Sequence, residues 1–424
     1  MKFASYSFGC RLNQAEKEDL DQRLLARGLV FSEDRPDFYF INTCAVTGKA
    51  EREARQLIGG IKNKWPGTKL VVTGCATTKW LSEGFSVSGI DLWIDNRNKE
   101  NIVELVLGLF QTGTVCDATV QGTLDDKFIN SGRRYIKIQE GCSRYCSYCL
   151  VPFLRGPSRS RPISEITVQI NQLGDKLAEA VLTAVNTEYF GKENGETLPR
   201  LVESLLNKTA VKRLSFGSIN PWSLTPELLE VYRKYFPGGR LTKYFHVPLQ
   251  SGSNRILKLM NRGYTLEEFS EKIKAVNALD PLVLIGTDVL AGFPGETDGD
   301  FHETYRFLES YPINKFHVFR FSLRDNTAAV RLVKELGEVP SAVKIFRSRR
   351  LKELGQNKYR QFLTRHLNRN FPALFLVESR GGFRKALLDN QVSVLVAPYR
   401  GFPGEIRVVR VRSLKGEQLF GEEV

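Results

Sequence analysis

The sequence predicts an α/β chain built from three segments, and three patterns along its 424 residues indicate this fold class. In the first segment, short apolar runs typical of strands alternate with stretches of helical periodicity. The second segment repeats this alternation through about six β-α units. In the third segment, β-rich runs are separated by glycine and proline. Alternating strands and helices favour parallel sheets with crossover helices, whereas closely spaced strands favour a small all-β unit.

Residues 1–120 are expected to form a parallel α/β domain. Each apolar run in this segment is followed by a stretch that leads on to the next run, which is the order that a parallel sheet requires. The predicted strands are residues 3–10, 37–44, 69–75 and 90–96, and the stretches that follow them are residues 13–28, 49–65, 76–84 and 99–110.

Residues 127–340 are expected to form a partial (β/α)6 barrel. Six strand-like runs alternate here with helical stretches, and barrels of this type place their chemistry at the carboxyl ends of the strands. The predicted strands are residues 133–142, 179–186, 213–220, 243–252, 284–296 and 315–322, and the clearest helices are residues 226–236, 267–279 and 299–310.

Residues 341–369 are expected to form a basic helix that leads into a small all-β barrel over residues 370–424. The barrel is predicted from β-rich runs with glycine and proline between them. These runs are residues 373–379, 392–399 and 405–414.

Positive charge is concentrated in this last part of the chain. The protein carries a net charge of +14, and the segment from Ser341 to Val424 contributes +10 of it, with 17 lysines and arginines against 7 acidic residues. Such an excess favours a polyanionic partner, most simply a nucleic acid. A basic protein without such a partner is the alternative.

The sequence is expected to belong to a cytosolic protein. Its first residues lack the apolar region of a signal peptide, and no apolar run approaches the roughly 18 residues of a membrane span. Thiols stay reduced in the cytosol, so seven cysteines favour metal or redox chemistry over a disulfide framework.

Three cysteines occupy equivalent places in the first segment. Cys10, Cys44 and Cys75, here called the N-terminal triad, each lie just past the end of a predicted parallel strand. Loops at these strand ends line one edge of a sheet, so the three thiols should converge into a ligand site. Three ordinary buried thiols are the alternative. Cys116 fits no such pattern and is expected to have no special role.

Three further cysteines lie within eight residues of each other. Cys142, Cys146 and Cys149, here called the loop triad, have the spacing C-x3-C-x2-C. Thiolates at this spacing suit zinc or an iron–sulfur cluster. Structural zinc needs four protein ligands, and the nearest downstream histidine is His246. A cluster held by three thiolates keeps one iron open for chemistry, and Tyr148 can pack over a cofactor ring.

At this point the chain resembles a known family. The loop EGCSRYCSYCLVPFLRGPSRSR resembles the radical S-adenosylmethionine (SAM) signature in its methylthiotransferase form. The resemblance covers essentially the whole chain, is strongest for the branch that modifies threonylcarbamoyladenosine in tRNA, and includes a last barrel similar to a TRAM domain. Its further motifs are FGCRLNQAE, NTCAVTGKA, VVTGC, HVPLQSGSNRILKLMNRGYT and GFPGET.

The resemblance implies a chemistry for both triads. The second segment becomes a radical SAM barrel, and the loop triad ligates a 4Fe–4S cluster whose open iron binds SAM. One electron then yields a 5′-deoxyadenosyl radical. The N-terminal triad holds a second 4Fe–4S cluster, which handles the sulfur. Two SAM molecules are used, one as methyl donor and one as radical source, and the product is a methylthio group.

The resemblance also implies contacts to SAM at two strand ends, Leu249–Gly252 and Ala291–Glu296. Ordinary turn chemistry is the alternative explanation for the glycines and proline there. The cofactor-binding candidates are therefore Tyr148, Gln250, Gly292, Pro294 and Gly295.

Three arginines follow the loop triad: Arg155, Arg159 and Arg161. Guanidinium groups in this position can pair with nucleic-acid phosphates or with the carboxylate of a cofactor. A solvated basic face is the alternative.

The substrate implied by the resemblance is tRNA at its anticodon stem-loop. A basic C-terminus suits phosphate contacts, and NTCAVTGKA resembles the branch that modifies C2 of N6-threonylcarbamoyladenosine next to the anticodon. The alternatives within the family are N6-isopentenyladenosine in tRNA and an aspartate of a ribosomal protein. An electron donor of the flavodoxin or ferredoxin type is expected as a second partner, and no membrane.

Two hypotheses lie outside this family. An RNA-binding protein with structural zinc would explain the charge and the last barrel, and a radical enzyme acting on a small molecule would explain the central segment. The chain also departs from the usual family pattern at four positions near predicted strand ends. These are Ala184, Asn220, Asp325 and Asn326.

Overall fold

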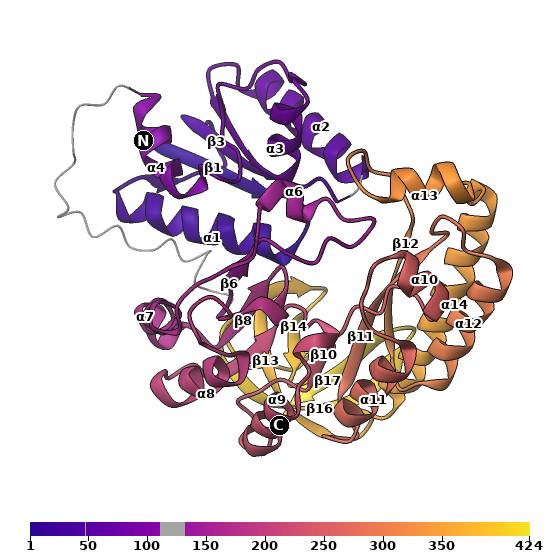
Figure 1. The fold of residues 1–424 in the computed structure, drawn as a ribbon. Helices are drawn as coiled ribbons and strands as arrows, with labels where there is room; N and C mark the ends of the chain where they lie inside the picture. Colours follow the sequence, from indigo (N-terminus) through magenta and orange to yellow (C-terminus); the bar gives the residue numbers. More distant parts are fainter. Residues whose placement is uncertain (47, 111–131) are drawn as a thin grey trace. The chain divides into compact units, whose positions relative to one another are not determined.

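The computed structural model describes residues 1–46, 48–110 and 132–424, which divide into two compact units (Figure 1). Unit 1 comprises Met1–Ile129, Glu140–Arg144 and Cys149–Ser158. Unit 2 comprises Asn130–Gln139, Tyr145–Tyr148 and Arg159–Val424. The chain therefore passes between the units inside the cysteine loop. Cys116 and the domain boundary predicted at residues 120–127 lie outside the described residues.

Unit 1 contains the predicted parallel sheet. Its five strands have the order β2-β1-β3-β4-β5, and every pairing is parallel. The two-residue strand β2 was not predicted, because so short a strand carries no alternating pattern. The strands are β1 (Lys2–Ser7), β2 (Val30–Phe31), β3 (Phe38–Thr43), β4 (Lys69–Gly74) and β5 (Leu92–Trp93).

Helices cover both faces of this sheet. Successive side chains of a strand point to opposite faces. Phe3 and Phe38 therefore pack with α1 (Arg11–Ala26) and α4 (Ile102–Gly108). On the other face, Ile41 and Leu70 pack with α2 (Gly48–Lys64) and α3 (Cys75–Ser82). The predicted α/β class with a parallel sheet is confirmed.

Unit 2 contains the six strands predicted for the second segment and one short strand, β7, that was not predicted, divided between two sheets. The first has the order β7-β6-β8-β9 and the second β10-β11-β12. Among the described residues, the two sheets are linked by one isolated parallel bridge, from Leu214 to Leu241, and not by a continuous ladder. The strands are β6 (Arg133–Glu140), β7 (Arg159–Ser160), β8 (Glu179–Ala184), β9 (Arg213–Phe216), β10 (Tyr244–His246), β11 (Leu284–Ala291) and β12 (Lys315–Arg320).

The helices of unit 2 begin where the sequence supplies capping residues. Thr265 and Glu268 form a capping box at the start of α11, and Thr297 and Asp300 form another at α12. Leu201 of α8 packs in the same core as the strands. The helices are α7 (Ile163–Leu173), α8 (Leu198–Lys208), α9 (Pro226–Tyr235), α10 (Asn254–Leu259), α11 (Leu266–Asn277), α12 (Asp298–Ser310) and α13 (Ala329–Leu336), with short 3-10 turns at Gly174–Lys176, Thr187–Tyr189 and Pro221–Ser223. A further 3-10 turn, Lys99–Asn101, lies in unit 1.

The predicted basic helix is α14 (Ser341–Thr364), and a closed all-β barrel follows it. The barrel order is β13-β14-β15-β17-β16, and residues such as Phe375 and Val394 fill its interior. Two of its strands, β14 and β17, were not among the predicted runs. The strands are β13 (Asn370–Arg380), β14 (Phe383–Leu388), β15 (Ser393–Val396), β16 (Ile406–Lys415) and β17 (Gln418–Glu423).

Part of the positive charge of α14 is used inside the protein. Lys344 is buried and pairs with Glu338 at 2.5 Å. Arg347 is also buried and pairs with Glu296 at 2.6 Å. These cations stabilise the packing of α14 and are not available to a polyanion. Within the part of the chain that the structure describes, no helix is both long and apolar enough to cross a membrane.

Candidate metal and cofactor sites

The structure places the N-terminal triad at one edge of the unit 1 sheet. Cys10 caps α1 after β1, Cys44 follows β3, and Cys75 begins α3 directly after β4. Because β1, β3 and β4 are neighbours in the sheet, their carboxyl ends lie side by side. The three cysteines therefore lie at one edge of the sheet, as the strand order predicts, and their joint ligation of one group stays a prediction.

Two glycines let the three loops approach closely. Gly9 has φ +86°, and a Cβ on it would lie 2.5 Å from Cys44 Cβ. Gly74 has φ +103°, and a Cβ on it would lie 2.6 Å from Asn42 Oδ1. Both are conformations and approaches that only glycine accepts without strain. The glycine before Cys10 and the glycine before Cys75 are thus part of the site.

A buried thiol in this triad needs a positive partner to ionise. Burial raises the pKa of Cys44 to about 12, and the positive charge of Arg155 only partly opposes this. Metal ligation requires the thiolate form. An all-sulfur donor set of three thiols therefore fits a group that brings its own positive charge, such as an iron–sulfur cluster or zinc.

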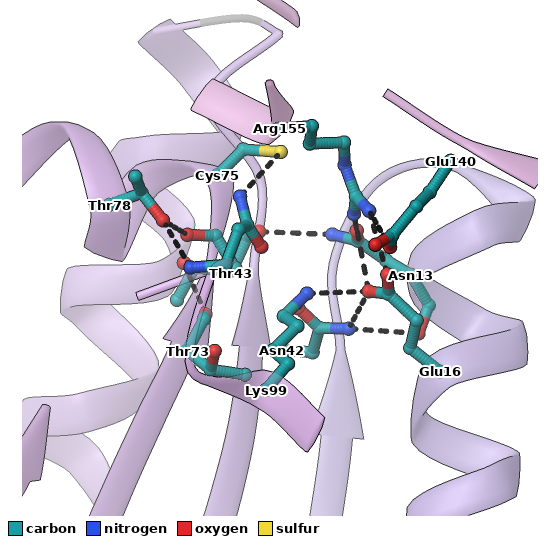
Figure 2. A network of polar contacts seen from close by, with 12 residues as sticks. Asn13, Glu16, Asn42, Thr43, Thr73, Cys75, Thr78, Lys99, Glu140 and Arg155 are labelled. Atoms are coloured by element: carbon teal, nitrogen blue, oxygen red, sulfur yellow. Dashed lines mark hydrogen bonds and ion pairs between the residues drawn. The ribbon is translucent and has the colours of Figure 1, made fainter. Parts of the chain in front are cut away.

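Below the triad lies a network of buried polar groups (Figure 2). Arg155, whose side chain is only 3% exposed, donates from Nη1 to Glu16 Oε1 at 2.7 Å and from Nη2 to Asn13 Oδ1 at 2.6 Å. Lys99 donates to the other oxygen of Glu16 at 2.5 Å. Burial alone would lower the pKa of Arg155, but Glu16 and the nearby Cys75 raise it well above its usual value. A fixed cation therefore lies near the triad.

Asparagine side chains join the loops to each other. Asn13 Nδ2 donates to the carbonyls of Phe8 and Thr43, both at 2.9 Å, and Asn42 Nδ2 donates to the Asn13 carbonyl at 3.0 Å. These bonds tie the first turn of α1 to the loops after β1 and β3. Asn96 Nδ2 lies 3.7 Å from Cys75 Sγ, within reach of an N–H···S hydrogen bond.

The role expected for Arg155 is corrected by this network. Its guanidinium is neither on a solvated basic face nor free for phosphate, because it is buried against Glu16 and Asn13. Arg161 donates to the Lys137 carbonyl at 3.0 Å and to Gln169 at 2.7 Å, so it too is engaged within the fold. Arg159 is exposed, and a phosphate contact there stays a prediction.

The loop triad follows β6 along the chain, and its members belong to different units. Cys142 and Cys149 lie in unit 1, and Cys146 lies in unit 2. All three are half-buried. In unit 1, the Cys142 N–H donates to the Gly156 carbonyl at 3.1 Å, which closes the loop on the residue after α6 (Val151–Arg155).

The part of the loop in unit 2 is held by α10 and its C-terminal residues. Ser147 N–H donates to the Met260 carbonyl at 3.0 Å, and its hydroxyl donates to the Leu259 carbonyl at 2.7 Å. Tyr145 has φ +51°, a conformation rare outside glycine, and Asn261 donates to its carbonyl at 3.1 Å. Cys146 is thus carried on a backbone that unit 2 fixes on both sides.

Arg262 is a site residue that the sequence did not single out. Its Nη1 donates to Cys146 Sγ at 3.4 Å, and its guanidinium lies 4.9 Å from the Trp222 ring centre and 5.3 Å from that of Tyr264. A guanidinium held against two rings keeps its charge, so a fixed cation lies within hydrogen-bond distance of the Cys146 sulfur. The only signal in the sequence was its place in the motif NRGYT.

Two cofactor candidates lie beside β11 in unit 2. The Tyr148 ring packs edge-on against Phe293, with centres 6.3 Å apart. Gln250 has φ +73° and forms a parallel bridge with Val289. Strained non-glycine backbone of this kind gathers at functional sites. Both positions suit a ligand at the end of β11, and the contacts with SAM stay predictions.

The motif after β11 has a clear packing role. A Cβ on Gly292 would lie 3.2 Å from Lys344 Cδ and would overlap the preceding carbon of that side chain. A Cβ on Gly295 would lie 2.9 Å from Leu336 Cδ1. Pro294 is buried between them. Packing against α13 and α14 therefore explains both glycines without a cofactor, and cofactor contact by these three residues is untested.

Two of the sequence departures are accommodated locally. Asn326 has φ +64°, in the left-handed region that asparagine tolerates better than other residues with a side chain. Asn220 Oδ1 accepts a hydrogen bond from Thr187 N–H at 3.1 Å, and Ala184 ends β8.

Comparison with known proteins agrees with this arrangement. Residues 136–308 match the Radical SAM superfamily, and residues 2–94 match Uncharacterized protein family UPF0004. The structure of the radical SAM methyltransferase TsrM from Kitasatospora setae superposes with a TM-score of 0.54 at 13% identity, covering 75% of this chain and 72% of that one. At this identity the likeness concerns the fold alone. The fold and the cysteine loop define a radical SAM enzyme.

Relatives that match nearly the full length of the chain indicate which kind of radical SAM enzyme it is. The chain is 32% identical over 420 residues to the threonylcarbamoyladenosine tRNA methylthiotransferase of Aquifex aeolicus, covering 96% of this chain and 100% of that protein. It is 30% identical over 439 residues to the tRNA-2-methylthio-N(6)-dimethylallyladenosine synthase of Thermotoga petrophila, covering 100% and 97%. The chain belongs to the radical SAM methylthiotransferase family.

Proposed function

We propose that this enzyme inserts a methylthio group at C2 of N6-threonylcarbamoyladenosine, next to the anticodon of tRNA. Similarity to the Aquifex aeolicus enzyme over 96% of the chain supports this substrate. N6-isopentenyladenosine is the second candidate, because the 30% identity to the Thermotoga petrophila enzyme is almost as high. A tRNA substrate also suits the basic residues of α14 and the C-terminal barrel, and the cytosolic location expected from the sequence.

Membership of the family implies one 4Fe–4S cluster and SAM, and the loop triad would ligate that cluster. When bound, these groups supply the radical chemistry that activates an inert C–H bond. The N-terminal triad would hold a second 4Fe–4S cluster, which supplies the sulfur. An electron donor of the flavodoxin or ferredoxin type is the expected partner for reduction, and two SAM molecules are consumed in each insertion.

The protein's own residues hold these groups in place. Gly9 and Gly74 bring the loops of the N-terminal triad together. Arg155 and Lys99 supply fixed positive charge below that triad, which Glu16 partly balances. Arg262 holds Cys146 through a hydrogen bond to its sulfur.

One observation carries the proposal. Three free thiols lie at the carboxyl edge of the unit 1 sheet, and among the described residues no further cysteine or histidine is evident as a fourth ligand. The same chain also has a complete radical SAM loop. Structural zinc would need a fourth protein ligand at each triad. A zinc-containing RNA-binding protein would be colourless after reconstitution, whereas the proposed enzyme absorbs broadly in the visible region.

The deciding experiment uses the anaerobically reconstituted full-length enzyme with a reductant and SAM. It is incubated separately with tRNA bearing threonylcarbamoyladenosine and tRNA bearing isopentenyladenosine, and nucleosides are analysed by mass spectrometry. A methylthio product from the first tRNA alone supports the proposal. Product from the second alone assigns the other branch, and cleavage of SAM without product from either removes tRNA as the substrate.

The two triads should be separable in this assay. Cys10→Ala is expected to leave reductive cleavage of SAM largely intact and to abolish methylthio product, because Cys10 lies in the N-terminal triad alone. Cys146→Ala is expected to abolish both activities. An equal loss of both activities in Cys10→Ala would contradict the division of labour between the triads.

A further inference from the structure

We propose that His246, Asp288 and His317 form a divalent metal site in unit 2, separate from both cysteine triads. The ligand atoms of the three side chains all lie within 4.8 Å of one another. His246 Nε2 is 3.0 Å and His317 Nδ1 is 3.4 Å from the same oxygen of Asp288, Oδ1. Two imidazoles and one carboxylate that converge on one point are a donor set for Fe²⁺, Zn²⁺ and related ions.

The sheet register brings these residues together. They come from three adjacent strands: His246 ends β10, Asp288 lies in β11, and His317 lies opposite Asp288 in β12. Gly286 lies opposite His246 in the neighbouring strand. A Cβ on Gly286 would lie 3.1 Å from His246 Nδ1, so its absence leaves space beside the imidazole. The juxtaposition therefore depends on parallel register and on one missing side chain.

The same face of β11 continues toward the cysteine loop. Side chains two positions apart on a strand share a face, so Leu290 lies on the face of Asp288. Leu290 packs in one cluster with Tyr148 and Phe293. Within unit 2, a residue on the same face as Asp288 thus packs against the hydrophobic cluster that Tyr148 also contacts.

The separations suit a metal ion. Zn–N and Zn–O bonds are about 2.0–2.2 Å long, so ligand atoms on one ion lie roughly 3.0–3.5 Å apart. The two distances to Asp288 Oδ1 fall in or near this range before any ion adjusts them. Both histidine nitrogens would give up the proton that they now donate to Asp288.

A neighbouring hydroxyl group favours the change of tautomer that metal binding requires at His246. When His246 Nε2 binds a metal, Nδ1 carries the proton, and the Tyr244 hydroxyl lies 3.4 Å from Nδ1 to accept it. Metal-bound histidines commonly donate their other N–H to such a partner.

The charges around the three side chains and their exposure to solvent both allow a metal ion that keeps some coordination positions open. Among the described residues, no lysine or arginine forms an ion pair with Asp288. The side chains are 8% exposed for His246, 23% for Asp288 and 42% for His317. A dication would therefore be held from the buried side, and its open positions would face water or an oxygen of a bound molecule.

Mn²⁺ is the probe that separates this site from the triads, because manganese prefers carboxylate and imidazole to thiolate. The reconstituted full-length protein is titrated with Mn²⁺, and free Mn²⁺ is measured by electron paramagnetic resonance. We expect one bound equivalent that Zn²⁺ displaces. His317→Ala and Asp288→Asn should weaken binding by about tenfold or more.

Two matched variants complete the test. His302→Ala removes an exposed histidine of α12 and should bind Mn²⁺ like the unmodified protein, as should Cys75→Ala. Circular dichroism establishes that each variant is folded, and iron content should be unchanged in every variant except Cys75→Ala. Absence of bound Mn²⁺ in the unmodified protein, or unchanged binding in His317→Ala and Asp288→Asn, would overturn the proposal whatever the substrate proves to be.

Discussion

At the scale of single residues, glycine decides whether the N-terminal triad can assemble. Gly9→Ala places a methyl group against Cys44 and forces a residue with a side chain into φ +86°. If the N-terminal triad holds the proposed second cluster, the variant should bind about half the iron and sulfide of the unmodified protein after reconstitution. Iron and sulfide analysis measures this directly.

Gly28 offers a matched control for this substitution. It has φ +79°, but nothing lies within 4 Å of where its Cβ would be. Gly28→Ala should therefore share the backbone strain, worth about 1–2 kcal/mol, and keep a full iron content. If both variants lost iron equally, strain and not the contact with Cys44 would be the cause.

The buried Arg155 gives a second prediction at this scale. Arg155→Met removes a partner of Glu16 and of Asn13 Oδ1 and leaves the Glu16 carboxylate with Lys99 and Asn42. Breaking a buried pair from one side costs about 3–5 kcal/mol when no other partner remains, so we expect a loss up to that size. Thermal or denaturant unfolding under anaerobic conditions measures it.

A double variant tests whether charge is the cause. Glu16→Gln added to Arg155→Met should cost less than the sum of the two single substitutions, because both break the same ion pair, even though Lys99 loses its carboxylate partner in the double variant. Arg97→Met, an exposed arginine of the same unit, should change stability by no more than about 0.5 kcal/mol. Additive effects of the Glu16 and Arg155 substitutions would refute direct coupling.

At the scale of elements, the join between α14 and the C-terminal barrel is sensitive to acid. His366 is fully buried; its Nδ1–H donates to the Phe362 carbonyl at 3.2 Å, and Asn390 donates to Nε2 at 2.7 Å. Because Nε2 accepts a hydrogen bond from Asn390 in this tautomer, it cannot take up a second proton without losing that bond. Burial accordingly lowers the pKa of His366 from 6.5 to about 4.

The sign of the pH effect follows from these values. Between pH 6.5 and 4 the unfolded chain binds a proton at His366 and the folded chain does not, so stability falls as the pH falls through this window. The full loss is about 3 kcal/mol and is complete below pH 4. The unfolding midpoint, measured across this range, should fall less steeply in His366→Gln, and equal slopes would contradict the assignment.

At the scale of the whole molecule, the charge of the last 84 residues should govern tRNA binding. Its net charge is +10, and Lys344 and Arg347 are engaged internally, so exposed cations such as Arg380 and Arg400 remain for phosphates. We expect affinity for tRNA to fall steeply with salt. Arg380→Ala and Arg400→Ala should each reduce the slope of log K against log salt by about 0.7–0.9 if the side chain contacts a phosphate.

A cation outside this segment provides the comparison. Lys234 on α9 is exposed and pairs with Glu203 at 3.2 Å. Lys234→Ala should leave the salt slope unchanged. Filter binding or fluorescence anisotropy at several salt concentrations measures all three variants, and salt-insensitive binding would remove the electrostatic role assigned to the C-terminal segment.

The sequence by itself determined the α/β class, the order of strands and helices, and the positions of six cysteines at strand ends and in one loop. These features depend on short-range periodicity and spacing, which a chain carries locally. Strands as short as β2 and β5 left little or no pattern to read, so their extents came only from the structure.

Tertiary structure alone decided which polar residues act together. Arg155 and Arg159 are four residues apart, yet packing buries one against Glu16 and leaves the other exposed. Arg262 meets Cys146 across 116 residues, and His246, Asp288 and His317 meet only because β10, β11 and β12 pair in register. Burial and long-range contact arise from how elements pack, and no local pattern in a sequence encodes them.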